Sequence, residues 1–515
     1  MTDSDRRHFL ALAIVFVLGV AVRLAYVERP LDHRLISPWR QADYIQIARN
    51  FHRADMNVLY PRIDWQADTP GYVEAEFPFL PWIGASFFRV TGYREQTLRW
   101  ISAFASIATL LAFLVLARAS LPPIGSVFAA TLFAFNPLLV NLATSMQPEA
   151  FMLLFSVVAV FLVDRWDKTE TLATLLGAGL VTGLAILAKA SAAYLGLLFA
   201  WLVWRKLGLA ALRSLRIYAA AALACIPPLL WYAWTHQFWL RYGNSLGLTN
   251  ESHFLGLDLL WPPVFLLGNF KWELLGVFTP PGLIIAGLAL FAPRLWIRLP
   301  LIWYAAACVF YVASARTSAD DWAFYYHSSS VAPACMLMGA GAAAIAHGYV
   351  TAWLPRGVAW NSSALAGLAM AGTLATTTVA SVVLVRHRDA QPDLLAMRAC
   401  ALRFADRVSP EELIVTRGGP SVDASGRPVA YNESMIFAWM DRRGFNYPAD
   451  KLSVEVLDGF VDRGASYWVA RSADLKDRAF RETAAGRYHR VDECADEYSL
   501  YRLRSSAALA RVAPS

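Results

Sequence analysis

Long apolar stretches recur along most of the chain, and they constrain its fold more than any other feature. An α-helix needs roughly 20 apolar residues to cross a bilayer, and about eleven stretches approach that length. Charged residues make up only 17% of the 515 residues, whereas a soluble chain carries about a quarter. The pattern therefore predicts an α-helical polytopic membrane protein embedded in a lipid bilayer. The predicted spans are residues 8–27, 98–117, 121–142, 147–164, 171–188, 191–208, 214–235, 276–293, 299–315, 330–348 and 364–385.

The basic residues of the short loops predict the orientation of these spans. Arg6 and Arg7 precede the first span, and the other basic clusters fall on the same side as these two if the N-terminus is cytoplasmic. The long polar segments 28–97 and 236–275 and the C-terminal region then lie on the extracytoplasmic side. The formal charge of +7 comes from the basic loops, so no nucleic-acid partner is expected. The first apolar run has no small-residue cleavage site behind it and is expected to remain as a helix.

The C-terminal region, from about residue 386, changes in character. Short strand-like and helix-like segments alternate there and predict a small extracytoplasmic α/β domain over residues 386–515, after a transmembrane module over residues 1–385. Cys400 and Cys494 share this region, and a disulfide between them would require an oxidising compartment. Whether they pair stays open at this stage. None of the five cysteines forms a CxxC motif, so they give no sign of a metal site.

Carboxylates gather in the first long loop, residues 28–97, where residues 42–53 can form an amphipathic helix lying at the membrane interface. A carboxylate can take a proton from an acceptor hydroxyl or orient a sugar. Glu76 begins an apolar run and so lies at the membrane boundary, which favours a functional role. Glu74 is better explained as a hydrated loop residue, and Asp64 fits either explanation. The carboxylates on this side are Asp43, Asp64, Glu74 and Glu76 in the loop and Glu149 at the outer end of the fourth span.

Basic groups on the same side are candidate ligands for a phosphate. Lys189 lies between two apolar spans, where its ammonium group could stabilise a leaving phosphate or simply reach the membrane surface. Arg241 could act in the same way. Tyr326 and His327 begin the tenth span, where aromatic residues are expected in any case.

Several motifs in the first half of the chain resemble those of bacterial GT-C glycosyltransferases, which are related to protein O-mannosyltransferases and to the lipid A aminoarabinose transferase. The likeness covers roughly residues 8–240, and the order and spacing of the motifs carry it. The motifs are Trp39-Arg-Gln-x-Asp-x-x-x-Ile-Ala-Arg-Asn-Phe51, Tyr60-Pro-x-x-Asp64, Glu76-Phe-Pro78, Arg99, Gln147-Pro-Glu149 and Leu187-Ala-Lys189.

The resemblance implies an inverting glycosyltransferase of the bacterial inner membrane, with its active site on the periplasmic side. A hexosyl or pentosyl group would move from a polyprenyl-phosphate-linked sugar to an acceptor that is lipid A, O-antigen, another envelope glycan or a protein. Such enzymes use no nucleotide sugar, and members with monophosphate donors generally need no metal or other cofactor.

The resemblance also suggests roles for particular residues, with one departure from the family pattern. Many relatives carry Asp-Glu where this chain has Arg40 and Gln41. Asp43 follows one helical turn later and can face the same cavity. The expected catalytic carboxylates are therefore Asp43 and Glu76. The expected donor-phosphate ligands are Lys189, Arg241 and His327, and the expected substrate contacts are Arg40, Gln41, Asp64, Glu149 and Tyr326.

A transporter or flippase of lipid-linked sugars is the alternative function. Such proteins carry internal repeats, broken spans and polar groups near the middle of the bilayer. The polar groups of this chain gather on one face and no short-period repeat is found, which favours an enzyme.

Overall fold

The computed structural model forms two compact units, which interleave along the sequence. Unit 1 consists of Met1–Arg29, Gln96–Trp231 and His253–His387, and unit 2 of Pro30–Glu95, Tyr232–Ser252 and Arg388–Ser515. The structure describes the whole chain except residues 1, 30, 32–36, 250–262, 315–317, 320, 354–360, 387–391, 423–425, 427 and 504–515. The first polar loop and the C-terminal region therefore belong to the same unit. The division of the chain at residue 385 stays a prediction.

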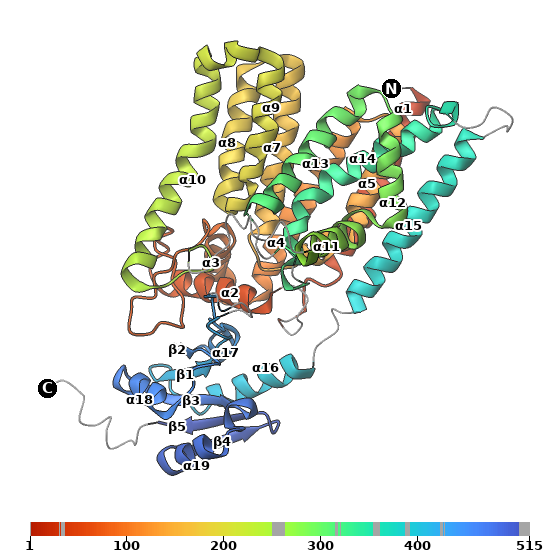
Figure 1. The fold of residues 1–515 in the computed structure, drawn as a ribbon. Helices are drawn as coiled ribbons and strands as arrows, with labels where there is room; N and C mark the ends of the chain where they lie inside the picture. Colours follow the sequence, from red (N-terminus) through yellow and green to blue (C-terminus); the bar gives the residue numbers. More distant parts are fainter. Residues whose placement is uncertain are drawn as a thin grey trace. The chain divides into compact units, whose positions relative to one another are not determined.

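Unit 1 is almost entirely helical (Figure 1). Its α-helices are α1 (Asp3–Leu24), α4 (Gln96–Ser120), α5 (Pro123–Phe135), α6 (Pro137–Leu142), α7 (Glu149–Thr169), α8 (Leu172–Ala188), α9 (Leu195–Leu207), α10 (Leu215–Tyr242, whose last turns belong to unit 2), α11 (Pro263–Trp272), α12 (Pro280–Leu288), α13 (Arg294–Ser314), α14 (Ser328–Ala346) and α15 (Ser362–Arg386). Shorter segments are η1 (Ala190–Tyr194), η2 (Gly208–Arg213), the π-helix η4 (Glu273–Phe278), η5 (Ala289–Phe291), η6 (Asp321–His327) and η7 (Thr351–Trp353).

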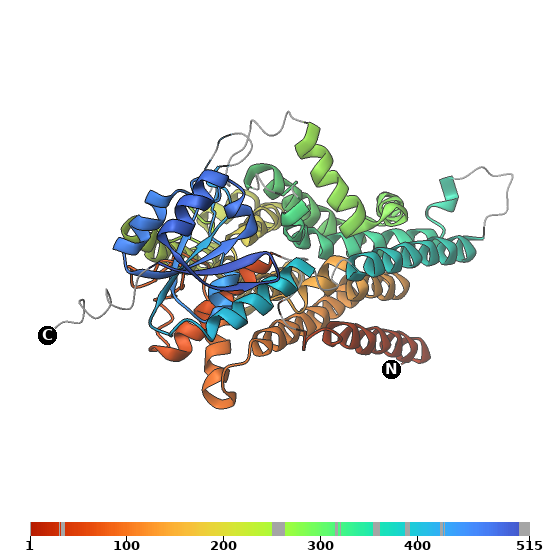
Figure 2. The ribbon, with the colours of Figure 1, turned by 90° about the horizontal axis from the view of Figure 1, so that it is seen from below.

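Helix α14 forms the core of unit 1 and lies among the other helices in both ribbon views (Figures 1 and 2). Its sequence is rich in Ala and Gly, and these small residues let neighbouring backbones approach closely. A Cβ atom at Gly125 of α5 would lie only 2.6 Å from the carbonyl oxygen of Gly339 in α14. The α5–α14 contact therefore requires glycine at this position.

Among the described residues, six helices are long and apolar enough to cross a membrane, or seven if one bent pair counts as a span. The bent pair consists of Phe265–Phe278 and Pro280–Phe291, and the chain bends by 83° at Thr279 between them. The predicted span 121–142 consists of two helices, because Asn136 and Pro137 separate α5 from α6. The amide of Asn136 donates 3.0 Å to the carbonyl oxygen of Gly276 and so joins this break to η4. The prediction of a polytopic helical protein is confirmed, and the number of eleven spans stays a prediction.

Unit 2 combines two loop helices with a small α/β domain. The loop helices are α2 (Pro38–Arg53) and α3 (Phe79–Thr91). The C-terminal domain contains α16 (Pro392–Ala405), β1 (Leu413–Arg417), α17 (Met435–Met440), β2 (Gly444–Tyr447), α18 (Val454–Asp462), β3 (Ala465–Arg471), η8 (Ser472–Leu475), α19 (Arg478–Arg487), β4 (His489–Cys494) and β5 (Tyr498–Arg502).

The five strands form one mixed sheet in the order β2-β1-β3-β5-β4. Strand β1 runs parallel to β2 and β3, whereas β5 is antiparallel to β3 and β4. Val415, Trp468 and Tyr501 belong to the core cluster in which the sheet packs on α18 and α19. Helix α16 lies on the other side of the sheet (Figure 2). The predicted α/β fold of the C-terminal region is thus confirmed, and its extracytoplasmic location stays a prediction. Cys400 and Cys494, whose pairing the sequence left open, form a disulfide that links α16 to β4.

The predicted amphipathic helix of the first loop is formed, but its surroundings differ from the prediction. Helix α2 is buried along almost its whole length, polar residues included, because α3 and α17 pack against it. It is therefore an internal helix of unit 2, and its buried polar side chains need partners within the protein.

Candidate active site

Asp43 lies in the middle of α2, and its side chain is enclosed by protein. The residue is only 2% exposed. Its Oδ1 atom accepts a hydrogen bond from Trp65 Nε1 at 3.1 Å and another from the hydroxyl of Ser434 in the C-terminal domain. Burial raises the pKa of Asp43 to about 7, although both hydrogen bonds and the nearby Arg40 favour the carboxylate form. The Asp43 carboxyl therefore changes its charge near neutral pH.

Glu76 forms an ion pair with Arg40, one turn before Asp43 on the same face of α2. Arg40 Nη2 lies 2.7 Å from Glu76 Oε1, and Arg40 Nη1 donates to the carbonyl oxygen of Leu246. The hydroxyl of Tyr44 lies 3.5 Å from Glu76 Oε2, at the limit of a hydrogen bond. The structure thus brings Arg40, Asp43 and Glu76 together. Gln41, the neighbour of Arg40, is also buried.

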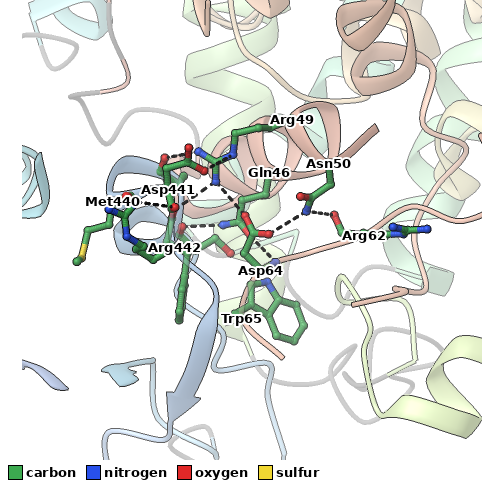
Figure 3. Close-up of polar contacts among 12 residues, drawn as sticks. Gln46, Arg49, Asn50, Arg62, Asp64, Trp65, Met440, Asp441 and Arg442 are labelled. Atoms are coloured by element: carbon green, nitrogen blue, oxygen red, sulfur yellow. Dashed lines mark hydrogen bonds and ion pairs between the residues drawn. The ribbon is translucent and has the colours of Figure 1, made fainter. Parts of the chain in front are cut away.

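Asp64 is held by three side chains of α2 (Figure 3). Its Oδ2 accepts from Arg49 Nη2 at 2.9 Å, and its Oδ1 accepts from Asn50 Nδ2 at 2.9 Å. Its backbone N–H donates to Gln46 Oε1, also at 2.9 Å. Since both carboxylate oxygens have protein partners, Asp64 fixes the segment around Trp65 against α2.

Glu74 is equally buried and has its own partners. Its Oε1 lies 2.8 Å from His236 Nδ1, and its Oε2 accepts from the hydroxyl of Thr249 at 2.5 Å. The expectation of a hydrated loop residue is therefore wrong for Glu74. Its burial follows from the packing of residues 232–249 of unit 2, which the residues around Glu74 did not indicate.

In unit 1, Lys189 forms an ion pair with Glu149, and both are buried. The Lys189 ammonium also lies 4.7 Å from the ring centre of Tyr325 and 4.5 Å from that of Tyr326, within the range of cation–π attraction. Lys189 is only 6% exposed, so its side chain is enclosed by protein. Glu149 Oε2 is buried and has no hydrogen-bond partner among the described residues. The structure thus brings Glu149, Lys189 and Tyr326 together.

His327 is fully buried, and both of its ring nitrogens have hydrogen-bond partners within the protein. Nδ1 lies 2.7 Å from Glu273 Oε1, and Nε2 lies 3.0 Å from the carbonyl oxygen of Ser318. Glu273 also accepts hydrogen bonds from the hydroxyls of Ser330 and Tyr304, each at 2.8 Å. His327 is therefore fixed by this cluster, next to the Tyr326 ring that covers Lys189.

Arg241 lies near the end of α10, and its guanidinium is 5.4 Å from the ring centre of Tyr242. It is exposed, unlike the other predicted phosphate ligands. Among the described residues, no group of three or more His, Cys, Asp and Glu side chains is arranged to hold a metal ion.

Sequence reasoning missed the partners of the candidate residues: Trp65, Ser434, Glu273 and His236. Glu273 had a usable signal, because an acidic residue within an apolar segment is costly unless it has a role. Ser434 had none, because a serine 391 residues away from Asp43 looks like any other.

Comparison with known proteins agrees with this fold. Residues 70–234 match the family model described as dolichyl-phosphate-mannose-protein mannosyltransferase. No curated protein sequence matches the chain. ArnT from Cupriavidus metallidurans in the apo state has a similar structure, with a TM-score of 0.60 at 14% identity over 98% of this chain and 99% of ArnT.

Two further solved structures share the fold. The Archaeoglobus fulgidus oligosaccharyltransferase has a TM-score of 0.59 at 14% identity over 94% of this chain and 73% of its own. The mycobacterial arabinofuranosyltransferase AftD has a TM-score of 0.57 at 13% identity over 96% of this chain and 40% of its own. Residues 70–234 therefore match the mannosyltransferase family model, and nearly the whole chain shares its fold with ArnT and with the two other glycosyltransferases.

Proposed function

We propose that this protein is an inverting glycosyltransferase that moves a sugar from a polyprenyl-phosphate donor to an extracytoplasmic acceptor. The acceptor is a lipid such as lipid A, an O-antigen or other envelope glycan, or a protein. Two similar structures support a donor of this kind, because ArnT was solved bound to undecaprenyl phosphate and the A. fulgidus enzyme AglB with a dolichol-phosphate. The site would face the periplasm of a bacterial inner membrane, with a cytoplasmic N-terminus.

In the proposed reaction, an acceptor hydroxyl oxygen attacks the anomeric carbon from the side opposite the phosphate. The bond between that carbon and the phosphate oxygen breaks, and polyprenyl phosphate leaves with the bonding electrons. A carboxylate takes the proton of the attacking hydroxyl. Attack from the opposite side inverts the configuration at the anomeric carbon.

Asp43 is the carboxylate that we assign as the base, and its burial beside Arg40 is the observation that carries the assignment. A general base works best when its pKa lies near the working pH, and burial raises the pKa of Asp43 to about 7. Its Oδ1 receives both observed hydrogen bonds, and among the described residues Oδ2 receives none. Oδ2 is therefore the atom we assign to receive the proton. Glu76, paired with Arg40, is the second candidate, and we assign it to hold Arg40 in place.

Lys189 is the group that we assign to the donor phosphate. Its ammonium would stabilise the negative charge that develops as the lipid phosphate leaves. The Tyr325 and Tyr326 rings lie within the range of cation–π attraction to this ammonium and so hold it in place. Glu149 Oε2, which has no hydrogen-bond partner in the described part of the chain, is available to accept a hydrogen bond from a sugar hydroxyl. With both ring nitrogens engaged, His327 is better suited to holding Tyr326 than to binding the phosphate directly.

The test is to incubate the purified protein with a polyprenyl-phosphate sugar and envelope acceptors, without any nucleotide sugar. We expect free polyprenyl phosphate to appear together with a glycosylated product whose anomeric configuration is inverted, as read by NMR of the sugar. If vesicles carrying the protein moved the intact donor across the bilayer without releasing polyprenyl phosphate, the protein would be a flippase and the proposal would be wrong.

A further inference from the structure

We infer that the C-terminal domain completes the catalytic site, with Ser434 acting as a positioning residue for the Asp43 carboxylate. This inference rests on the proposed function, because it assigns a partner to the proposed base. It makes the domain a working part of the enzyme, since a side chain from this domain would set the orientation and proton affinity of the base.

Ser434 contacts α2 through two separate groups. Its hydroxyl donates to Asp43 Oδ1, and its carbonyl oxygen accepts from Gln46 Nε2 at 2.8 Å. Asp43 and Gln46 are three residues apart and so lie on the same face of α2. Ser434 is fully buried, and it immediately precedes α17. A buried residue held through both its side chain and its backbone has little freedom to move away from Asp43.

The rest of α17 is fixed to the same face of α2 by arginines (Figure 3). Arg49 Nη1 donates a hydrogen bond to the carbonyl oxygen of Ala438 at 2.9 Å, and Arg49 Nε lies 2.9 Å from Asp441 Oδ1. Arg53, one turn further along α2, also pairs with Asp441. Positions 43, 46, 49 and 53 follow one another at helical spacing, so a single row of side chains aligns the two helices. This alignment holds the Ser434 hydroxyl at Asp43.

The hydrogen bond from Ser434 affects both the geometry and the chemistry of Asp43. Together with Trp65 Nε1 it fixes Oδ1, which leaves Oδ2 for the acceptor hydroxyl. A donor to a carboxylate stabilises the charged form and so lowers the pKa. Burial acts in the opposite direction and is the larger effect. The charged groups facing Asp43 are Arg40 on α2 and Glu433 beside Ser434, and their effects on the pKa of Asp43 oppose each other.

The experiment measures the pH dependence of polyprenyl phosphate release by the full-length protein carrying Ser434→Ala. Without the hydroxyl donor the pKa of Asp43 should rise, so the acidic limb of the rate profile should move upward by roughly one pH unit. We expect a loss of about tenfold at pH 6 and a much smaller loss at pH 9. Ser434→Thr keeps a donor and should restore the wild-type profile. Ser421→Ala is the matched control, because Ser421 is in the same domain and, among the described residues, its hydroxyl binds only the exposed side chain of Asp450.

A wild-type pH profile in Ser434→Ala would overturn the inference, as would an equal loss at every pH that Ser434→Thr does not restore. If Ser434→Ala fails to fold, Ser434→Cys offers a weak donor of similar size and should show a smaller upward shift. The variant Asp43→Asn distinguishes a failure of the proposed function from a failure of the inference about Ser434. If Asp43→Asn keeps full activity, the proposed base is wrong. If Asp43→Asn is inactive while Ser434→Ala behaves as wild type, the inference alone fails.

Discussion

Arg40 and Glu76 form a buried ion pair, with Nη2 and Oε1 2.7 Å apart, and Arg40 stands at one of the two positions where the resemblance implied an acidic pair. Glu76 is paired with a cation in this way, whereas Asp43, one turn after Arg40 on α2, is a buried carboxyl whose pKa is raised by burial. The two carboxylates that the sequence could not distinguish are thereby assigned different roles. This difference can be tested by stability as well as by activity.

Glu76→Gln should lower the free energy of unfolding substantially and have a smaller effect on the rate of transfer. Removing one partner of a buried ion pair leaves the other charge uncompensated, which costs about 3–5 kcal/mol. The double variant Arg40→Gln with Glu76→Gln should recover part of this loss, because neither charge then remains buried alone. Denaturant unfolding in detergent measures the free energy of unfolding of the single and the double variant. Glu482→Gln, which breaks an exposed pair with Arg478, is the control and should change nothing measurable. Equal stability of Glu76→Gln and wild type would contradict the assignment.

The wild-type enzyme should lose activity as the pH falls below about 7. Only the carboxylate form of Asp43 can accept a proton, and the pKa of Asp43 is about 7. The rate of polyprenyl phosphate release should therefore fall about tenfold per pH unit on the acidic side. A steady-state rate profile from pH 5 to pH 9 checks this. A flat profile down to pH 5 would mean that a carboxylate with an ordinary pKa is the base.

Lys189→Met should abolish transfer by removing the proposed phosphate ligand, at a cost of about 100-fold or more in rate. This change also leaves the buried Glu149 carboxylate without its cation, so the loss of transfer could come from poor folding. The double variant Lys189→Met with Glu149→Gln separates the two effects. It should fold as well as wild type, by thermal unfolding, and still fail to release polyprenyl phosphate. Recovery of activity in the double variant would show that Lys189 serves only to neutralise Glu149.

The Cys400–Cys494 disulfide leads to two predictions, one about the stability of the protein and one about the side of the membrane on which the C-terminal domain lies. It joins residues 94 apart in the sequence, and closing a loop of that length stabilises a domain by about 4–5 kcal/mol in the chain-entropy account. Cys400→Ser with Cys494→Ser should lower the melting temperature of the protein. In intact cells, a membrane-impermeant thiol reagent should label the two cysteines only after an impermeant reductant is added. Labelling that required permeabilised cells would place the C-terminal domain on the cytoplasmic side and contradict the proposed orientation.

The sequence predicted the parts of this protein that depend on local pattern. Hydropathy indicated the helical membrane unit, and short alternating segments indicated the C-terminal sheet around Val415 and Trp468. The first-loop motif pointed to Asp43 and Arg40. The partners of these residues escaped prediction, because Ser434 and Asp43 meet only through tertiary packing. Local pattern also failed for Glu74, whose burial depends on residues 236–249.

The most direct test of the account compares Asp43→Asn with Asp55→Asn, which changes an exposed carboxylate in the same loop. We expect Asp55→Asn to release polyprenyl phosphate like wild type and Asp43→Asn to lose at least about 100-fold in rate. Because a raised carboxyl pKa weakens the folded state as pH rises from about 4 to 7, Asp43→Asn should also gain stability over wild type across this range. A stably folded but inactive Asp43→Asn protein is the predicted result. Near-normal release by Asp43→Asn would contradict the account.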